Sequence, residues 1–320
     1  MKQFALAALM TAGVAGSVSA ESWDMPTPYG DATFHTQNIA QFAEEVAAAT
    51  DGALEITVHS AGSLFPHAEI KNTVRSDQVP IGEFFLSRLV NEDAAYGLDS
   101  QPFVATSYED AAKLWEAQEP VVTELLAEQG LVPLFSVPWP AQGLYTNGEI
   151  KTVEDLSGLR FRAYNAALEE FAALAGAAPV QVEAPDIPQA FATGQVEAMI
   201  TSPSTGANST AWDFVTHYSP INAWVPKNIV VVNERSFRRL PEEVQTAVME
   251  AAEAAEARGW EMSKAEAEAQ TAVLAENGMT IYEPSDELKA GLEAIGEEML
   301  ATWRESASDA ALSVMSTYQE

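Results

Sequence analysis

Residues 155–176, DLSGLRFRAYNAALEEFAALAG, contain a turn, a short strand and a helix in immediate succession. Gly158 suits the turn, the residues around Arg162 alternate as in a strand, and the next segment has apolar residues at helical spacing. The same order continues in PVQVEA (179–184), DIPQAFATGQ (186–195) and VEAMITS (196–202). Strands that alternate with helices in this way predict an α/β fold, with helices covering the faces of the sheet.

The segments before residue 140 alternate similarly. Ser107 and Asp110 form a Ser-x-x-Asp capping box at the start of one helix, and Gly130 ends that helix. The expected helices are 31–50, 67–76 and 107–130, and the expected strands are 53–62, 79–87 and 131–139.

The segment after residue 220 predicts a long strand followed by a very long helix. INAWVPKNIVVVNER (221–235) is apolar on both faces, which is typical of a central strand. Residues 240–278 then predict a helix far longer than the average of about 11–12 residues, beginning behind Pro241. Such a helix is long enough to lie across both halves of the molecule. A further strand (279–284) and a helical tail (286–305) follow.

Residues 1–20, MKQFALAALMTAGVAGSVSA, have the pattern of a secretory signal peptide. Lys2 gives a positive start, a short apolar run follows, and Val18-Ser19-Ala20 suits signal peptidase. The run is short for a membrane span, and no later window is long and apolar enough for one. We therefore expect export and removal of residues 1–20, which leaves roughly 300 residues, enough for two domains.

Composition narrows the classes of site and partner. The chain has no cysteine, which excludes disulfides, thiolate metal sites and a cysteine nucleophile. Its formal net charge of −31 disfavours nucleic acid and anionic lipid as partners. An anionic ligand would therefore need a local positive group that is shielded from water.

Arg162 is the strongest candidate for such a group. In the strand, Arg160, Arg162 and Tyr164 share one face, and Arg160 adjoins the turn, where solvent or an acidic neighbour is expected. Arg162 lies at the carboxyl end, where open α/β sheets bind their ligands. Its guanidinium can hold a carboxylate with two parallel hydrogen bonds. The spacing alone favours an ion pair with one of the many acidic side chains.

The order of several motifs resembles a known family. FAEEVAAATDGALEITVHSAGSL (42–64) is followed by DLSGLRFRAYN (155–165), IPQAFATGQVEAMITSPSTG (187–206) and VVVNERSFRRLPEEVQTAVMEAA (230–252). The chain thereby resembles the extracytoplasmic solute-binding proteins of tripartite ATP-independent periplasmic (TRAP) transporters. The resemblance covers essentially the whole chain after residue 20, and its most specific parts are D-L-x-G-L-x-x-R and A-L/F-x-x-G-x-V-E/D-A/G.

The resemblance implies a two-lobed periplasmic-binding-protein fold that closes over its ligand on hinge strands and a long helix. It also implies that Arg162 binds the ligand carboxylate, and that a membrane permease receives the ligand from the periplasm without ATP hydrolysis by this chain. Under this division, one lobe contains residues 21–146 and about 233–275, and the other contains 147–232 and about 276–320.

Two departures from the family pattern bear on the ligand. Gln142 stands where many members have a second arginine, and Ser202, with Thr201 and Ser204, stands where an asparagine is frequent. Both changes reduce charge or reach in the pocket, so a dicarboxylate or a sialic-acid-like ligand is not expected.

Aromatic residues near strand ends suggest the rest of the ligand. Taken singly, each is better explained as a core residue, and His35 could donate to ligand or cap local backbone. With one arginine and few other charges, they favour an aromatic monocarboxylate such as a hydroxybenzoate or mandelate-like acid, with an aliphatic or 2-oxo monocarboxylate as the alternative. The predicted ligand set is Arg162, Gln142, Tyr164, Ser202, Phe34, His35, Phe84, Phe85, Trp139, Asn165, Trp224 and Asn228.

No catalytic or metal motif is recognisable. SPSTG lacks the G-x-S-x-G elbow, FATGQVEA lacks a phosphate-loop lysine, and the histidines are too scattered for a metal site. A carrier that binds and releases its ligand, without cofactor, metal or bond-making, is therefore the leading hypothesis. An exported hydrolase is the main alternative, and an adhesin or structural protein is a weaker one.

Overall fold

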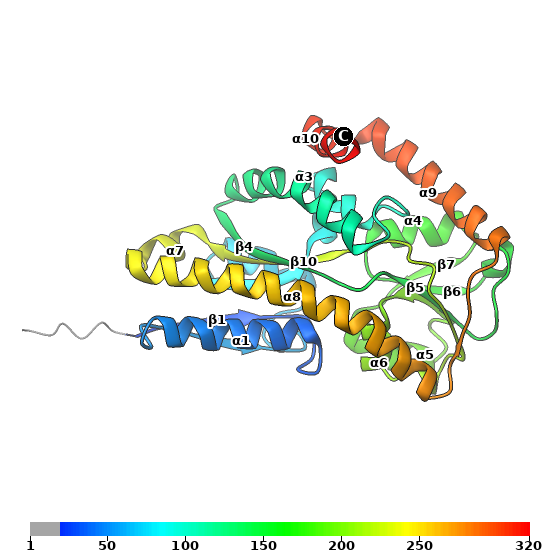
Figure 1. Cartoon of the computed structure of the whole chain (residues 1–320), viewed down its shortest axis with the longest axis horizontal. Helices are drawn as coiled ribbons and strands as arrows, with labels where there is room; N and C mark the ends of the chain where they lie inside the picture. Colours follow the sequence, from blue (N-terminus) through cyan, green and yellow to red (C-terminus); the bar gives the residue numbers. More distant parts are fainter. Residues whose placement is uncertain (1–19) are drawn as a thin grey trace, which may run out of the picture.

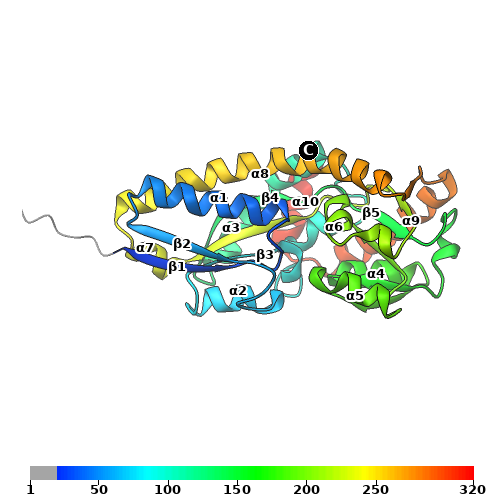
Figure 2. The same ribbon diagram turned by 90° about the horizontal axis from the view of Figure 1, so that it is seen from below.

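The computed structural model describes residues 20–320, and the predicted signal peptide lies outside this range apart from Ala20. Helices and strands form two lobes side by side, joined by extended segments and one long helix (Figures 1 and 2). The prediction of a two-lobed α/β fold is therefore confirmed. No helix in residues 20–320 combines the length and hydropathy of a bilayer-spanning segment.

The first lobe contains two small sheets. Strands β1 (Glu21–Pro26) and β2 (Leu54–His59) pair in parallel. β10 (Lys227–Asn233) is the centre of an antiparallel sheet, between β3 (Ile81–Phe85) and β4 (Leu131–Pro138). The helices of this lobe are α1 (Phe34–Ala49), α2 (His67–Arg75) and α3 (Tyr108–Ala127).

The second lobe is built on one six-stranded sheet with the order β11-β9-β5-β8-β6-β7. Its strands are β5 (Gly143–Thr146), β6 (Arg160–Ala163), β7 (Ala178–Gln181), β8 (Ala198–Thr201), β9 (His217–Ser219) and β11 (Thr280–Ile281). Its short helices are α4 (Ala166–Leu174), α5 (Ile187–Ala192) and α6 (Pro203–Asn208). Because β6, β7 and β8 run parallel, their carboxyl ends meet at one edge of the sheet.

Helix α8 (Glu242–Glu276) follows α7 (Glu234–Arg239) and spans the molecule, as its length predicts. It packs against α1 and β4 in the first lobe and against α6 in the second (Figure 1). The chain ends in α9 (Asp286–Ser306) and α10 (Asp309–Gln319).

The structure divides the lobes differently from the predicted division in three places. Residues 227–232 are expected in the second lobe, but within β10 they form the centre of the antiparallel sheet of the first lobe. Strand β5 belongs to the second lobe, although residues up to 146 were assigned to the first. Gly143 permits this, because a Cβ there would lie 2.3 Å from the ring of Tyr218 on the neighbouring strand β9. Helix α10 packs on α3 of the first lobe rather than staying with the second, since its buried face joins the cluster that contains Leu114 (Figure 1).

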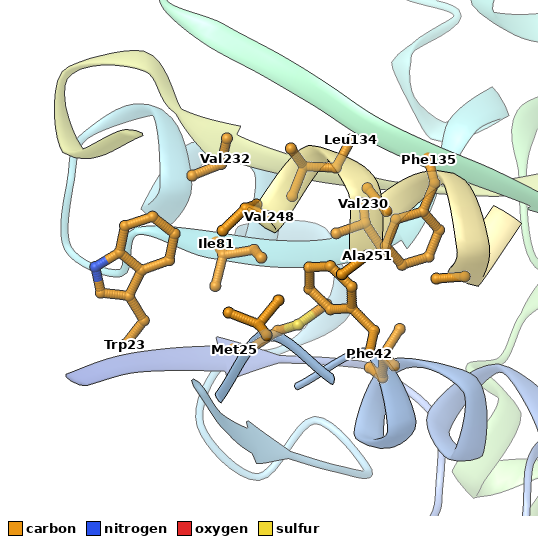
Figure 3. Close-up of a cluster of buried hydrophobic side chains, with 14 of the residues drawn as sticks. Trp23, Met25, Phe42, Ile81, Leu134, Phe135, Val230, Val232, Val248 and Ala251 are labelled. Carbon is orange, nitrogen blue, oxygen red and sulfur yellow. The ribbon is translucent and has the colours of Figure 1, made fainter. Parts of the chain in front are cut away.

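The core of the first lobe lies between the two sheets, α1 and α8. Figure 3 shows side chains that converge from all of these elements, including Trp23 and Met25 of β1, Phe42 of α1 and Val230 of β10. Each of these four side chains is buried. This packing fixes the position of β10, and with it the connecting segment 223–226 that leads from the second lobe into β10.

Two extended segments, 139–142 and 223–226, connect the lobes side by side. Backbone bonds join Trp139 N to Pro226 O (2.7 Å), Gln142 N to Trp224 O (3.0 Å) and Ala223 N to Gln142 O (3.0 Å). The strand expected at 221–235 is therefore shorter than predicted: β10 begins at Lys227, after Pro226, which has no N–H to donate to a ladder.

Candidate ligand-binding site

A cavity with about 410 Å³ of empty space lies between the lobes beside the connecting segments. The first lobe contributes loops after β1 and around β3, and the second contributes the carboxyl ends of its parallel strands, where α/β sheets bind ligands. The lining residues are Tyr29, His67, Phe85, Trp139, Gln142, Arg162, Tyr164, Glu183, Ala184, Thr201 and Thr205.

Arg162 supplies a buried positive charge in this cavity. Its side chain is 3% exposed, its Nε donates to Val182 O (2.9 Å), and the guanidinium carbon lies 4.9 Å from the centre of the Tyr164 ring. No carboxylate oxygen of residues 20–320 lies within 4.0 Å of its nitrogens. Burial lowers the pKa of Arg162 to about 10, so the group stays charged at neutral pH. With Nε occupied, the terminal nitrogens remain for a ligand carboxylate.

Glu183, which follows β7, places a carboxylate in the same cavity and was not predicted. It accepts from Arg88 Nη1 (3.0 Å) and lies 3.3 Å from His67 Nδ1. Burial alone would raise the pKa of Glu183, but the bond to His67 and the charges of Arg88 and Arg162 outweigh burial and lower it to about 2. Glu183 is therefore an ionised acceptor, and it ties the second lobe to two residues of the first.

The hydrogen bonds of His67 define its tautomer. The backbone N–H of Phe85 donates to His67 Nε2 (3.1 Å), so the ring proton must be on Nδ1, which donates to Glu183. Burial lowers the pKa of His67 despite the neighbouring carboxylate. His67 is therefore neutral at pH 7 and orients one oxygen of Glu183.

We expect the His67→Gln variant to lose less stability than wild type when the pH is lowered. Because the pKa of His67 is lower in the folded chain than its ordinary value of 6.5, the unfolded chain binds the proton first. The neutral His67 therefore makes its full contribution to the free energy of unfolding above about pH 6.5. This contribution decreases as the pH drops towards the folded pKa, by at most about 2 kcal/mol at pH 5. Glutamine can accept from Phe85 N and donate to Glu183 without titrating.

Urea unfolding at pH 7.5 and pH 5.0 measures this difference. His59→Gln, on the partly exposed histidine beside Asp24, is the matched control and should keep the wild-type dependence. An equal pH dependence in wild type and His67→Gln would contradict the neutral, buried His67.

Five residues of the predicted ligand set line the cavity: Arg162, Gln142, Tyr164, Phe85 and Trp139. Tyr164 OH donates to Gln142 Oε1 (3.2 Å) and accepts from Trp224 Nε1 (2.9 Å). Gln142 Nε2 donates to Pro140 O (2.7 Å). Gln142 and Tyr164 therefore satisfy part of each other's hydrogen-bonding capacity. Trp224, which does not line the cavity, donates to Tyr164 from the far side of the cavity wall.

The structure gives the other predicted residues places outside the cavity lining. Phe34 and Phe84 are buried in the cores of the first lobe, on opposite sides of its sheet. Ser202 accepts from Thr205 N (3.0 Å) and thereby caps α6. Asn165 caps α4, and its Nδ2 donates to Ser87 Oγ (2.9 Å) across the lobes.

His35 and Asn228 lie behind the wall of the cavity. Both are 1% exposed, and each contacts Glu83: Asn228 Nδ2 donates to it (2.9 Å), and His35 Nδ1 lies 3.4 Å from the same oxygen. Neither residue lines the cavity.

The rule that selected Arg162 would also have found Glu183. Glu183 comes just after PVQV, at the carboxyl end of a strand. Arg162 was chosen because it also lies at the carboxyl end of a strand. Tyr29 and His67 carry no such signal, because they reach the cavity from a loop and from the first residue of α2, whose placement depends on the packing of the first lobe.

Comparison with known proteins identifies the family. The DctP model, described as bacterial extracellular solute-binding protein, family 7, matches residues 28–309. The chain therefore belongs to this family of extracytoplasmic transport proteins, and the predicted resemblance to TRAP solute-binding proteins is confirmed.

Three similar proteins illustrate the relationship. DctP7 of Bordetella pertussis, an extracytoplasmic solute receptor binding pyroglutamic acid, shares 43% identity over 94% of this chain and 100% of its own, with a TM-score of 0.93. A marine metagenome TRAP solute-binding protein, specific for pyroglutamate and holding co-purified pyroglutamate, shares 40% identity over 94% of this chain and 99% of its own (TM-score 0.91). A solute-binding protein of Albidiferax ferrireducens is 28% identical over 53% of this chain, which spans about half (50%) of that relative.

Proposed function

We propose that this chain is the solute-binding component of a TRAP transporter and that its ligand is pyroglutamate. The observation that carries the proposal is one small cavity that holds both an ionised carboxylate and a buried guanidinium with no carboxylate oxygen of residues 20–320 within 4.0 Å. Pyroglutamate has a carboxylate for Arg162 and a ring N–H for Glu183.

The remaining groups of the cavity suit the rest of this ligand. The hydroxyls of Thr201 and Thr205 and the second N–H of Gln142 can donate to a ring carbonyl. Tyr29, Phe85 and Trp139 add apolar surface for the ring methylenes. The 43% and 40% identical neighbours that bind pyroglutamate support this assignment.

The aromatic monocarboxylate predicted from the sequence finds no support in these neighbours. Phe34, Phe84 and Trp224, which that prediction counted as ligand contacts, do not line the cavity. The cavity also contains the carboxylate of Glu183, which suits a ligand with an N–H donor better than a purely apolar ring.

We further propose that residues 1–20 direct export to the periplasm and that the loaded protein delivers its ligand to the membrane permease. Ligand binding across both lobes would favour closure by differential affinity for the closed state. In this function the chain makes and breaks no covalent bond.

Thermal denaturation and calorimetry with purified protein test the proposal, after unfolding and refolding to remove any co-purified ligand. L-pyroglutamate at 100 times its dissociation constant should stabilise the protein by about 2.7 kcal/mol. 4-Hydroxybenzoate, mandelate and pyruvate should give no comparable shift. A response to 4-hydroxybenzoate or pyruvate that exceeds the response to pyroglutamate would contradict the assignment, and chemical conversion of the ligand would favour an enzyme.

A further inference from the structure

Tyr29 and Trp139, two aromatic residues of the cavity wall, share one buried hydrogen-bond acceptor. Asn228 Oδ1 accepts from Tyr29 OH (3.1 Å) and from Trp139 Nε1 (3.0 Å). The two rings meet edge to face, with their centres 4.9 Å apart. Because both polar hydrogens go to Asn228, the two residues offer the cavity ring surface rather than a hydrogen-bond donor.

The orientation of the Asn228 amide is set from its other side by Glu83. This carboxylate is 1% exposed and accepts from Asn228 Nδ2 (2.9 Å) and Thr27 Oγ1 (2.5 Å), with His35 Nδ1 at 3.4 Å. Burial would raise the pKa of Glu83, but its bonds and the neighbouring His35 outweigh burial and lower it, which favours the ionised form.

An ionised carboxylate only accepts, and an indole N–H only donates. With the Asn228 amide reversed, its oxygen would face the Glu83 carboxylate, and its NH2 group would face the indole N–H of Trp139. Both contacts would be repulsive and buried, which is costly. The observed orientation is therefore the one that satisfies Glu83, Tyr29 and Trp139 together.

We propose that Glu83 and Asn228 are positioning residues that hold the aromatic wall of the ligand cavity. Glu83 orients the Asn228 amide, and the amide oxygen holds Tyr29 and Trp139 in the arrangement that a small ring requires. The proposal rests on the proposed function in one respect, namely that this cavity is the ligand site. It assigns Asn228 a role through two other residues rather than a contact with the ligand.

An exchange of the two functional groups tests this role. Asn228→Asp alone sets two carboxylates against each other at pH 8, where a shared proton is disfavoured. Glu83→Gln/Asn228→Asp restores the match, because glutamine donates to the new aspartate, whose other oxygen still accepts from Tyr29 and Trp139. We expect the single variant to bind L-pyroglutamate about tenfold or more weakly, and the double variant to recover to within about threefold of wild type.

A spectroscopic readout distinguishes positioning from a general loss of structure. The indole N–H resonance of Trp139, assigned by its loss in Trp139→Phe, should move in ligand-free Asn228→Asp and return in the double variant. Asn72→Asp, which adds the same charge on the exposed face of α2, should change neither the resonance nor the affinity.

Wild-type affinity and an unmoved resonance in Asn228→Asp would overturn the proposal, as would a double variant no better than the single one. If Asn228→Asp fails to fold, the double variant decides: folding with near-wild-type affinity supports the proposal, and failure overturns it. If wild type does not bind pyroglutamate, the proposed function fails, whereas the Trp139 resonance still tests the positioning role in the ligand-free protein.

Discussion

Replacing Arg162 by alanine should lower the affinity for L-pyroglutamate by about 10²- to 10⁴-fold. Two charge-assisted hydrogen bonds from the guanidinium to the carboxylate contribute on the order of 1.5–3 kcal/mol each in a site shielded from water. The ligand-free protein should keep its stability to within about 1 kcal/mol. The variant loses the bond from Nε to Val182 O, but it also removes a buried cation that has no carboxylate within 4.0 Å among residues 20–320.

Isothermal titration for affinity and urea unfolding for stability measure both effects. Arg160→Ala is the matched control, because Arg160 lies on the same strand face but is 47% exposed and pairs with Glu197 (2.8 Å). It should bind like wild type. Arg162→Lys should fall between wild type and Arg162→Ala, since lysine keeps the charge but loses the planar fork. Unchanged binding by Arg162→Ala would remove the carboxylate anchor from the proposal.

The fold could be read from the sequence because its signals are local. The Ser107 capping box, the Gly158 turn and Pro241 at the start of the long helix act within a few residues, and helical or strand spacing acts within one element. In the structure, α3 begins after Ser107, β6 begins after the Gly158 turn, and α8 begins after Pro241. The return of α10 to α3 and the placement of β5 were not predictable in this way, because both depend on contacts between distant segments.

The site could be predicted only in part for the same reason. Arg162 carries a signal in its strand position and its motif, but an aromatic residue near a strand end does not reveal which face of the strand it occupies. Phe84 and Phe85 illustrate this: they are adjacent, yet Phe84 lies in the core cluster on one face of the sheet, and Phe85, in the cluster on the other face, lines the cavity. Period-two alternation guarantees that one of the pair turns away from the cavity, and the sequence does not show which one.

The polar side of the cavity shows a second limit of prediction from the sequence. Glu183 is one of 47 acidic residues, and most of these are surface residues in any exported acidic protein. What distinguishes it is the pairing with Arg88 and His67, which come from segments about a hundred residues away in the sequence. Because of this pairing, Glu183 is a hydrogen-bond acceptor with a fixed position in the cavity. A ligand with an N–H group is therefore expected in place of the aromatic acid.

Glu183→Ala should remove the ability to distinguish a lactam from a lactone. The test pair is L-pyroglutamate and its lactone analogue, 5-oxotetrahydrofuran-2-carboxylate, in which a ring oxygen replaces the N–H group. Wild type should prefer the lactam by about 10- to 100-fold, because the lactam N–H adds a donor to Glu183, whereas the lactone sets a ring oxygen against its charge. In Glu183→Ala the two affinities should differ by less than about threefold, whereas Arg162→Ala should weaken both ligands alike.

The pH dependence distinguishes a carboxylate that stays ionised from one that becomes protonated near pH 5. Since the pKa of Glu183 is lowered to about 2, the lactam preference should stay constant from pH 8 to pH 5. The contribution of Glu183 to folding is present above its ordinary pKa of 4.5 and is lost only as the pH falls from there towards 2. Because its side chain is 40% exposed, the ion pair with Arg88 should contribute no more than about 1 kcal/mol to the stability of the free protein.

Glu183→Gln is the matched variant, since it keeps one acceptor oxygen and removes the charge. It should retain part of the lactam preference, with its stability at pH 7 close to that of Glu183→Ala. A Glu183→Ala protein that still prefers the lactam tenfold would show that another group accepts the ring N–H. The assignment of the acceptor would then move to the remaining oxygens of the cavity, those of Gln142, Thr201 and Thr205, while the role of Arg162 would stand on its own measurement.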